Sequence, residues 1–260
     1  TIDHNKWYNI TCIMGELIRI GAEEGQPGLG ATIDTTGAWV TSFSLGKDHI
    51  FFPKDLIATS EGDTKARGGS HICSLIFGPD PEGKGPQHGY ARGVEWAVTG
   101  SDLRYVRLRH IASEGEYAGI QHDLGIQVID IDHLKILATN MSVTNNGNRE
   151  IMIAPGFHPY FSGPARFDEG SKVADKDTRV ERKGNYTLRT VQLLSGITVN
   201  MVAVNCPEST VWSDMPEEFH CVEPSALPLS AEPGPEDVLR PGEFKEYAVS
   251  FVLNLSESSS

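Results

Sequence analysis

The sequence predicts an all-β protein built as one large sandwich of antiparallel sheets over residues 1–260. Apolar and polar residues alternate with a period of two nearly everywhere a period can be read, as in strands that bury one face. Turn-forming residues, among them 27 glycines and 15 prolines, separate these runs at regular intervals. No stretch combines a helical period with a capping residue over three turns. All three observations favour short strands over helices.

The alternation identifies the segments that we expect to be strands. They are residues 31–36, 38–45, 103–111, 124–131, 134–143, 150–154, 186–194, 197–204, 210–212 and 247–253. Asn145-Asn-Gly-Asn148 lies between two of these segments and predicts a hairpin turn, because an Asn-Gly step accepts the positive φ angles of such a turn. We expect a loop at residues 80–86, which are rich in Pro and Gly, and a polar tail at residues 255–260.

The charge balance limits the classes of partner. The formal net charge is −13, from 22 basic and 35 acidic residues. Binding to nucleic acid or to an anionic membrane is therefore not expected, because phosphate surfaces need clustered Lys and Arg. No apolar run is long enough for a membrane span, and the N-terminal residues do not resemble a signal peptide. We expect a cytoplasmic monomer or weak homodimer whose partner is a small molecule.

The cysteines do not form a recognisable metal or redox motif. They are widely spaced and include no C-x-x-C pair, and they stand at Cys12, Cys73, Cys206 and Cys221. Buried, reduced thiols are the expected state. A set made of His71, Cys73 and His88 matches no standard zinc spacing, so no metal site is predicted.

Polar residues interrupt the β pattern at three points rich in glycine or proline, which are residues 87–92, 155–161 and 219–224. We expect strand ends and loops there, and loops on a rigid scaffold commonly carry catalytic residues. Each side chain also has an ordinary structural role open to it. A histidine can hydrogen-bond within a loop, a carboxylate can pair with arginine, and an arginine can lie on the surface.

Together, these segments resemble the aldose 1-epimerases, and most closely the branch that acts on glucose 6-phosphate, the hexose-6-phosphate mutarotases. The resembling pieces are Ala66-Arg-Gly-Gly-Ser70, Gln87-His-Gly-Tyr-Ala-Arg92, Phe157-His-Pro-Tyr-Phe161 and Cys221-Val-Glu-Pro224, with residues 29–43 and 239–243 similar to the opening and closing strands. The resemblance implies the galactose-mutarotase-like supersandwich, in agreement with the period of two.

The chain departs from the phosphate-sugar branch in two places. After Arg67-Gly-Gly that branch continues with Ile-Pro and then a Phe-Pro step, whereas this chain has Ser-His-Ile-Cys-Ser-Leu-Ile-Phe. The stretch after Phe161 is also compressed. Both differences concern whether glucose 6-phosphate is the substrate. The residues that the resemblance assigns to mutarotation are all present.

The resemblance implies an enzyme that interconverts the α and β anomers of an aldohexose without a cofactor, with a hexose 6-phosphate favoured as substrate. By this resemblance Glu223 is the base that takes the proton of the anomeric hydroxyl, and His158 is the acid that protonates the ring oxygen. His88 would hydrogen-bond the ring region. We expect acid and base on opposite sides of the C1–O5 unit, and a nearby carboxylate to keep the histidine charged at neutral pH.

Other residues are candidates for holding the sugar. The resemblance assigns Arg67 and Arg92 to a clamp on the 6-phosphate, because a guanidinium binds phosphate through two parallel N–H groups. Asp214 and the stretch 175–177 are candidates for accepting sugar hydroxyls. The aromatic side chains that could support a sugar face, or simply pack in the core, are those of Trp96, Tyr160, Phe161 and Trp212.

Three alternatives remain open at this stage. One is a mutarotase for an unphosphorylated aldose. A second is a non-catalytic carbohydrate-binding sandwich, since one fold hosts many functions. Such a module has no need for Glu223 with His88 and His158. The third is a polysaccharide lyase or hydrolase domain, for which 260 residues leave little room for an added helical domain.

Overall fold

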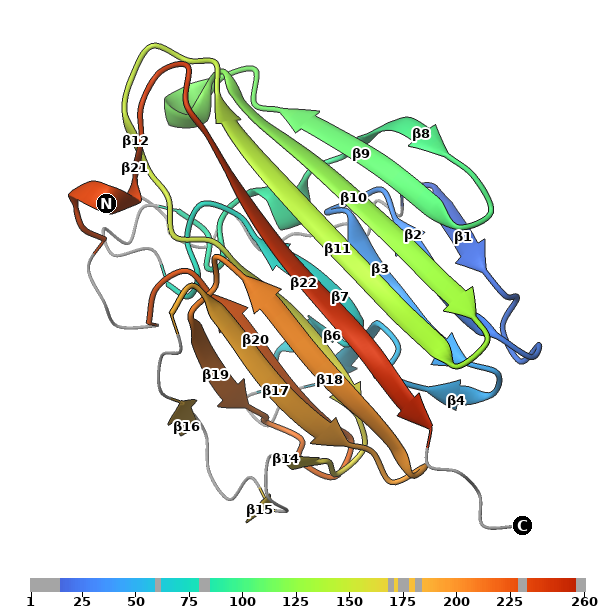
Figure 1. Ribbon diagram of the computed structural model, residues 1–260. Coiled ribbons are helices and arrows are strands. Elements are labelled where there is room, and N and C mark those ends of the chain that lie inside the picture. The colour runs from blue at the N-terminus through green and yellow to red at the C-terminus, as the bar shows by residue number, and fades with distance from the viewer. Residues whose placement is uncertain are drawn as a thin grey trace.

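The computed structural model describes residues 15–58, 62–79, 85–167, 171–172, 178–180, 184–228 and 233–255. These residues form two large antiparallel sheets packed as two layers (Figure 1). Sheet A has the strand order β1-β2-β3-β7-β13-β20-β19-β16, with β4 beside β3. Sheet B has the order β15-β14-β17-β18-β22-β11-β10-β9-β8. The predicted all-β sandwich is confirmed.

The strands of sheet A come from both halves of the chain. They are β1 (Leu17–Gly21), β2 (Leu29–Asp34), β3 (Trp39–Leu45), β4 (Asp48–His49), β7 (Ser70–Cys73), β13 (Gly156–Ser162), β16 (Thr178–Val180), β19 (Glu208–Trp212) and β20 (Phe219–Ser225).

Sheet B contains the longest strands. Its members are β8 (Ala97–Ser101), β9 (Tyr105–Ile111), β10 (Ile120–Ile131), β11 (Leu134–Asn145), β14 (Arg166–Phe167), β15 (Ser171–Lys172), β17 (Tyr186–Gln192), β18 (Ile197–Val204) and β22 (Phe244–Leu255). Two short pairs lie outside the sheets, β5 (Asp55–Ala58) with β6 (Thr64–Arg67) and β12 (Ile151–Met152) with β21 (Val238–Leu239). Single 3₁₀ turns occur at η2 (Ala91–Gly93), η3 (Gly115–Tyr117) and η4 (Pro235–Asp237).

The central strands of sheet B follow the predicted alternation closely. In β11 every second side chain from Leu137 to Val143 is buried, and β22 does the same from Tyr247 to Leu253. Removing each large apolar side chain from water stabilises the fold by about 1.5–3 kcal/mol. The period of two in the sequence therefore arises because one face of each strand packs on sheet A and the other face is more exposed.

An aromatic cluster joins the two layers. The Phe51 ring lies 5.6 Å from that of Phe161 on β13 and 4.9 Å from that of Phe251 on β22. Phe161 is therefore a core residue rather than a platform for a sugar. Trp96 is also buried in the core, where its indole N–H donates to the Ala91 carbonyl. Core packing was the alternative expected for both side chains.

Some details of the expected topology are wrong. The chain turns at Asn145–Asn148, but the flanking strands do not form a hairpin, because β11 pairs with β10 and β22 while β12 pairs with β21. The Asn145 side chain instead ties the turn to a distant segment by donating to the carbonyls of Arg149 and Leu239. Tertiary hydrogen bonds have overridden the local turn signal.

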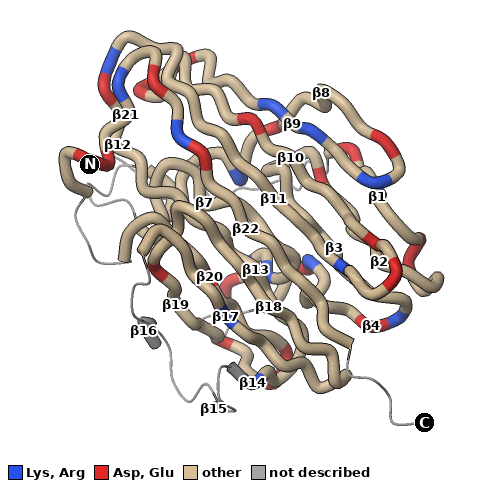
Figure 2. Tube along the Cα trace, viewed as in Figure 1, with Lys and Arg blue, Asp and Glu red and all other residues tan. Residues whose placement is uncertain are grey.

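Several features of the sequence lie outside the described residues. They are Cys12, most of the 80–86 loop, the stretch 175–177 and nearly all of the polar tail. Within the described residues, basic and acidic side chains are interspersed along the trace (Figure 2). None of the helices found there has the length and apolarity of a membrane span.

Candidate functional site

A row of ionisable side chains crosses three neighbouring strands of sheet A. The register pairs His71 on β7 with His158 on β13. On the other side of β13, Tyr160 pairs with Cys221, which places His158 directly opposite Glu223 on β20. Side chains opposite one another in an antiparallel pair lie about 4.5–5.5 Å apart at Cβ. Strand pairing alone therefore brings His71, His158 and Glu223, the polar row, together.

The polar row lies on the face of sheet A that points away from sheet B. Alternate residues of a strand point to opposite faces. Phe157 and Phe161 belong to the apolar core between the sheets, so His158 and Tyr160 point to the opposite face. Residues 155–161 and 219–224 were expected to be strand ends and loops. That expectation is wrong, because His158 and Glu223 lie within β13 and β20, whose side chains are buried along nearly their whole length.

The central pair of the row is in close contact and out of water. The distance from His158 Nε2 to Glu223 Oε2 is 3.5 Å, and the two side chains are only 7% and 5% exposed. Burying a polar or charged group without partners is costly. Because such a cluster costs stability, it is found mainly where a function requires it, and buried ionisable groups are therefore enriched at functional sites.

His88 completes the cluster from a loop. Its ring centroid lies 5.2 Å from that of His158, and its backbone has a positive φ of 63°. The Gly78 N–H donates to His88 Nδ1, so a neutral His88 carries its proton on Nε2. Gly89 allows the loop to approach Ser74, the residue that follows β7, because a Cβ at Gly89 would stand 1.8 Å from the carbonyl oxygen of Ser74. The loop thus presents a hydrogen-bond donor beside His158.

Burial sets the protonation of the histidines. It lowers the pKa of His158 well below its ordinary value, and the nearby His71, His88 and Arg92 lower it further. Burial also lowers the pKa of His88 to about 3, again with a contribution from Arg92. The expectation that a carboxylate keeps His158 charged in the resting protein is therefore not met, because desolvation is the larger effect. His158 Nδ1 has no hydrogen-bond partner among the described residues.

Arg67 and Asp214, both predicted to hold the substrate, contact each other. Arg67 donates from Nε and Nη2 to Asp214 Oδ2 at 3.2 and 2.7 Å. The guanidinium also lies over the Trp212 ring, 5.2 Å from its centroid. Arg92, in η2, is half-buried and close enough to lower the pKa of all three site histidines. All six residues predicted from the sequence therefore gather at one face of sheet A.

Two of the four predicted aromatic platforms lie at this face. The Tyr160 ring stacks on His158 with centroids 4.6 Å apart, and the Trp212 ring stands edge-on to His158 at 6.2 Å. Trp96 and Phe161 lie in the core instead.

His71 is the site residue that sequence reasoning missed. Its ring lies 4.7 Å from that of His158 and is only 2% exposed. His71 Nδ1 lies 3.2 Å from the Ile72 carbonyl, which can only accept, so in the neutral ring Nε2 is an acceptor. His71 stands in the Ser-His step that replaces Ile-Pro after Arg67-Gly-Gly, and from the sequence it was considered only as a possible zinc ligand.

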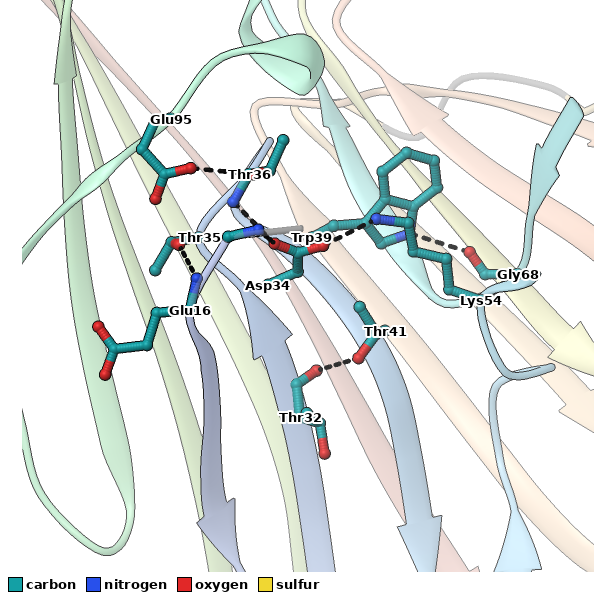
Figure 3. Close-up of polar contacts among 11 residues, drawn as sticks. Glu16, Thr32, Asp34, Thr35, Thr36, Trp39, Thr41, Lys54, Gly68 and Glu95 are labelled. Atoms are coloured by element: carbon teal, nitrogen blue, oxygen red, sulfur yellow. Dashed lines mark hydrogen bonds and ion pairs between the residues drawn. The ribbon is translucent and has the colours of Figure 1, made fainter. Parts of the chain in front are cut away.

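A network at the β2–β3 turn holds His71 in place through Trp39, whose ring centroid lies 4.4 Å from that of His71. Figure 3 shows the contacts that Trp39 and Asp34 make in this network. The Trp39 indole N–H donates to the Gly68 carbonyl at 3.0 Å. Lys54 lies over the same indole ring and donates to Asp34 Oδ2 at 3.1 Å. Because a hydrogen bond at its edge and Lys54 over its ring hold the indole, the His71 ring has a fixed neighbour on β3, on the side away from His158.

Comparison with known proteins identifies the family. The family model described as aldose 1-epimerase matches residues 23–202, which is more than half of the chain. The chain belongs to the aldose 1-epimerase family. The match includes His158 and ends before β20 and Glu223. A comparison with curated protein sequences gives no significant match.

Solved structures show the same sandwich. A galactose mutarotase related enzyme from Lactobacillus acidophilus is similar with a TM-score of 0.67 and 16% identity, over 93% of this chain and 99% of that one. A Synechocystis protein gives 0.72 and 18%, over 96% and 100% of the chains. An aldose epimerase homologue from C. elegans gives 0.64 and 14%, over 93% and 100%. At these identities the likeness establishes the fold, which is galactose mutarotase-like.

Proposed function

We propose that this epimerase is a mutarotase that interconverts the α and β anomers of an aldohexose by opening and closing its ring. The contact of 3.5 Å between His158 Nε2 and Glu223 Oε2 carries this proposal. It supplies one proton donor and one proton acceptor on a buried face, with His88 beside them. Mutarotation needs only such a pair.

The reaction balances with these two groups alone. Glu223 takes the proton of the C1 hydroxyl while His158 gives a proton to ring oxygen O5. The C1–O5 bond breaks and the electron pair of O1 forms the carbonyl. Rotation about C1–C2 followed by the reverse transfers closes the ring on the other face. In the reactive form His158 is the imidazolium and Glu223 is ionised. Because burial keeps His158 neutral at rest, this form is a minor one of the coupled pair, whose groups titrate as a unit. Each general catalyst contributes about 10²–10⁴ in rate.

The contact between His158 and Glu223 differs from the expected placement of acid and base. We expected them on opposite sides of the C1–O5 unit, but they project from adjacent strands toward the same face. This placement suits the substrate, because the two oxygens that exchange protons are both bonded to C1. Neighbouring groups can therefore serve neighbouring atoms.

The pairing of Arg67 with Asp214 favours an unphosphorylated aldose. A guanidinium already bound to a carboxylate at 2.7 Å has its charge neutralised, and the carboxylate would repel a phosphate. The pair instead offers donors and acceptors suited to neutral hydroxyls. A hexose 6-phosphate is the second candidate, favoured by the sequence resemblance and by two guanidiniums, Arg67 and Arg92, that act on His88 and His158.

The test is anomer exchange measured by NMR saturation transfer on glucose, galactose and glucose 6-phosphate. We expect exchange above the buffer rate on a neutral hexose, and a loss of that activity in Asp214→Asn together with a relative gain on the phosphorylated sugar. Asp123→Asn is the matched control, since Asp123 pairs with Arg109 on sheet B, away from the polar row. Sugar binding without any exchange would instead indicate a carbohydrate-binding module.

A further inference from the structure

Three metal-ligating side chains converge within the site. His158, Cys221 and Glu223 each offer one ligand atom, and these atoms all lie within 4.8 Å of one another. All three residues are buried. Cys221 and Glu223 are two residues apart on β20, so they point to the same face, and both lie against β13.

We propose that these residues form a Zn²⁺ site that reversibly inhibits the enzyme. One nitrogen, one thiolate sulfur and one carboxylate oxygen are ligands that zinc prefers. Zn–N and Zn–O distances of about 2.0–2.1 Å at a tetrahedral angle require the N and O atoms to stand about 3.3 Å apart. The distance between His158 Nε2 and Glu223 Oε2 is 3.5 Å, so these two ligands need almost no movement. The fourth position is left for water or a sugar hydroxyl.

The charges around the cluster suit a divalent ion. Zinc binding releases one proton from the Cys221 thiol, and the metal then balances one thiolate and one carboxylate. Two guanidiniums act on the ligands, Arg67 on Cys221 and His158 and Arg92 on His158, and the charge of Arg67 is countered by Asp214, whose Oδ2 lies 2.7 Å away. Cys221 has a free thiol, so it is available as a ligand.

Inhibition follows from the identity of the ligand atoms. Zinc occupies the lone pair of His158 Nε2 and a carboxylate oxygen of Glu223, the atoms that would move protons to and from the sugar. Metal-bound protein can therefore neither donate nor accept these protons. The inhibition rests on the proposed function, whereas zinc binding does not.

The experiment measures zinc binding and activity separately on the 260-residue chain after it has been stripped with a chelator. Affinity comes from competition with a chromophoric zinc indicator, and stoichiometry comes from metal analysis after gel filtration. Cys221→Ser removes one ligand at nearly constant volume. Cys206→Ser, at a buried free cysteine in the core, is the matched thiol control. Each inhibition curve is normalised to the zinc-free activity of the same variant.

We expect one tightly bound Zn²⁺ that depends on Cys221, with affinity weakened about a hundredfold or more in Cys221→Ser and unchanged in Cys206→Ser. The zinc concentration that halves the activity should shift by the same factor. Equal affinity in Cys221→Ser and the parent protein, or no saturable binding, would overturn the site. Zinc binding through Cys221 without any loss of measurable mutarotation would instead remove His158 and Glu223 as the catalytic pair and leave the metal site standing.

Discussion

The central strands of the two sheets use the same β geometry in different ways. In sheet B, β10, β11 and β22 are long and alternate between a buried and a more exposed face. In sheet A, β7, β13 and β20 are shorter and buried on both faces. One face of these strands is apolar and packs on sheet B, while the other carries the polar row. The alternating strands of sheet B stabilise the fold through apolar burial. The polar row of sheet A lowers the stability, because burying ionisable groups costs free energy.

Glu223→Gln, in sheet A, should lower the activity more than any other change considered, whereas a matched change in sheet B should leave the activity unaltered. The amide keeps the shape of the side chain but cannot take a proton, so kcat for anomer exchange should fall roughly 10²–10⁴-fold with the fold retained. NMR exchange rates and circular dichroism measure the two quantities. Asp123→Asn on β10 is the matched carboxylate change and should leave kcat within about twofold. Full activity in Glu223→Gln would remove the proposed base.

Phe251→Ala should test the structural role of sheet B. The Phe251 ring is 1% exposed and contacts Phe51 and Phe161. Its removal should lower the free energy of unfolding by about 3–5 kcal/mol through lost burial and a cavity, while kcat of the folded protein changes little. Urea denaturation measures the loss. Phe244→Ala on the same strand is the control, because Phe244 is 63% exposed and should matter by no more than about 0.5 kcal/mol.

The pH dependence of stability should reveal a buried histidine of sheet B. Burial, with a smaller contribution from His110, lowers the pKa of His122 to about 3. The unfolded chain binds this proton near pH 6.5, as an ordinary histidine does. The stabilising contribution of a neutral His122 is therefore complete above about pH 6.5. It is lost as the pH falls toward 3, by up to about 1.4 kcal/mol per pH unit.

His122→Gln removes this titration while keeping a polar side chain opposite Ser74, whose hydroxyl lies 2.5 Å from His122 Nε2. Urea denaturation between about pH 4 and pH 7 should show a shallower loss of stability in the variant than in the parent. Identical slopes would mean that His122 titrates alike in the folded and unfolded states.

His71→Asn should give the smallest effect. The Asn amide can still donate to the Ile72 carbonyl, but the acceptor at Nε2 is lost. One hydrogen bond to a sugar hydroxyl is worth about 0.5–1.5 kcal/mol, so KM should rise roughly two- to twelvefold with kcat nearly constant. His71→Phe keeps the ring between Trp39 and His158 and should raise KM alike. A fall in kcat at constant KM would show that His71 acts through His158 rather than on the sugar.

Prediction from the sequence worked best where one physical requirement dominates. Strands such as 124–131 and 134–143 were found because a strand with one wet face must alternate. Strands β7, β13 and β20 were not recognised, because a strand buried on both faces has no alternation to read. His158 and Glu223 were identified by their sequence motifs. Because polar residues interrupt the apolar pattern there, the same segments were assigned to strand ends and loops instead of strands.

The sequence by itself determined the β class, the residue types available for proton transfer and the resemblance to an epimerase family. Tertiary structure alone decided that β13 lies between β7 and β20, and so which of those residues meet. It also decided that Arg67 binds Asp214, 147 residues away, and that desolvation keeps the site histidines neutral. The physical reason is that local patterns record which face of a strand is buried, whereas the order of strands in a sheet depends on contacts between distant parts of the chain.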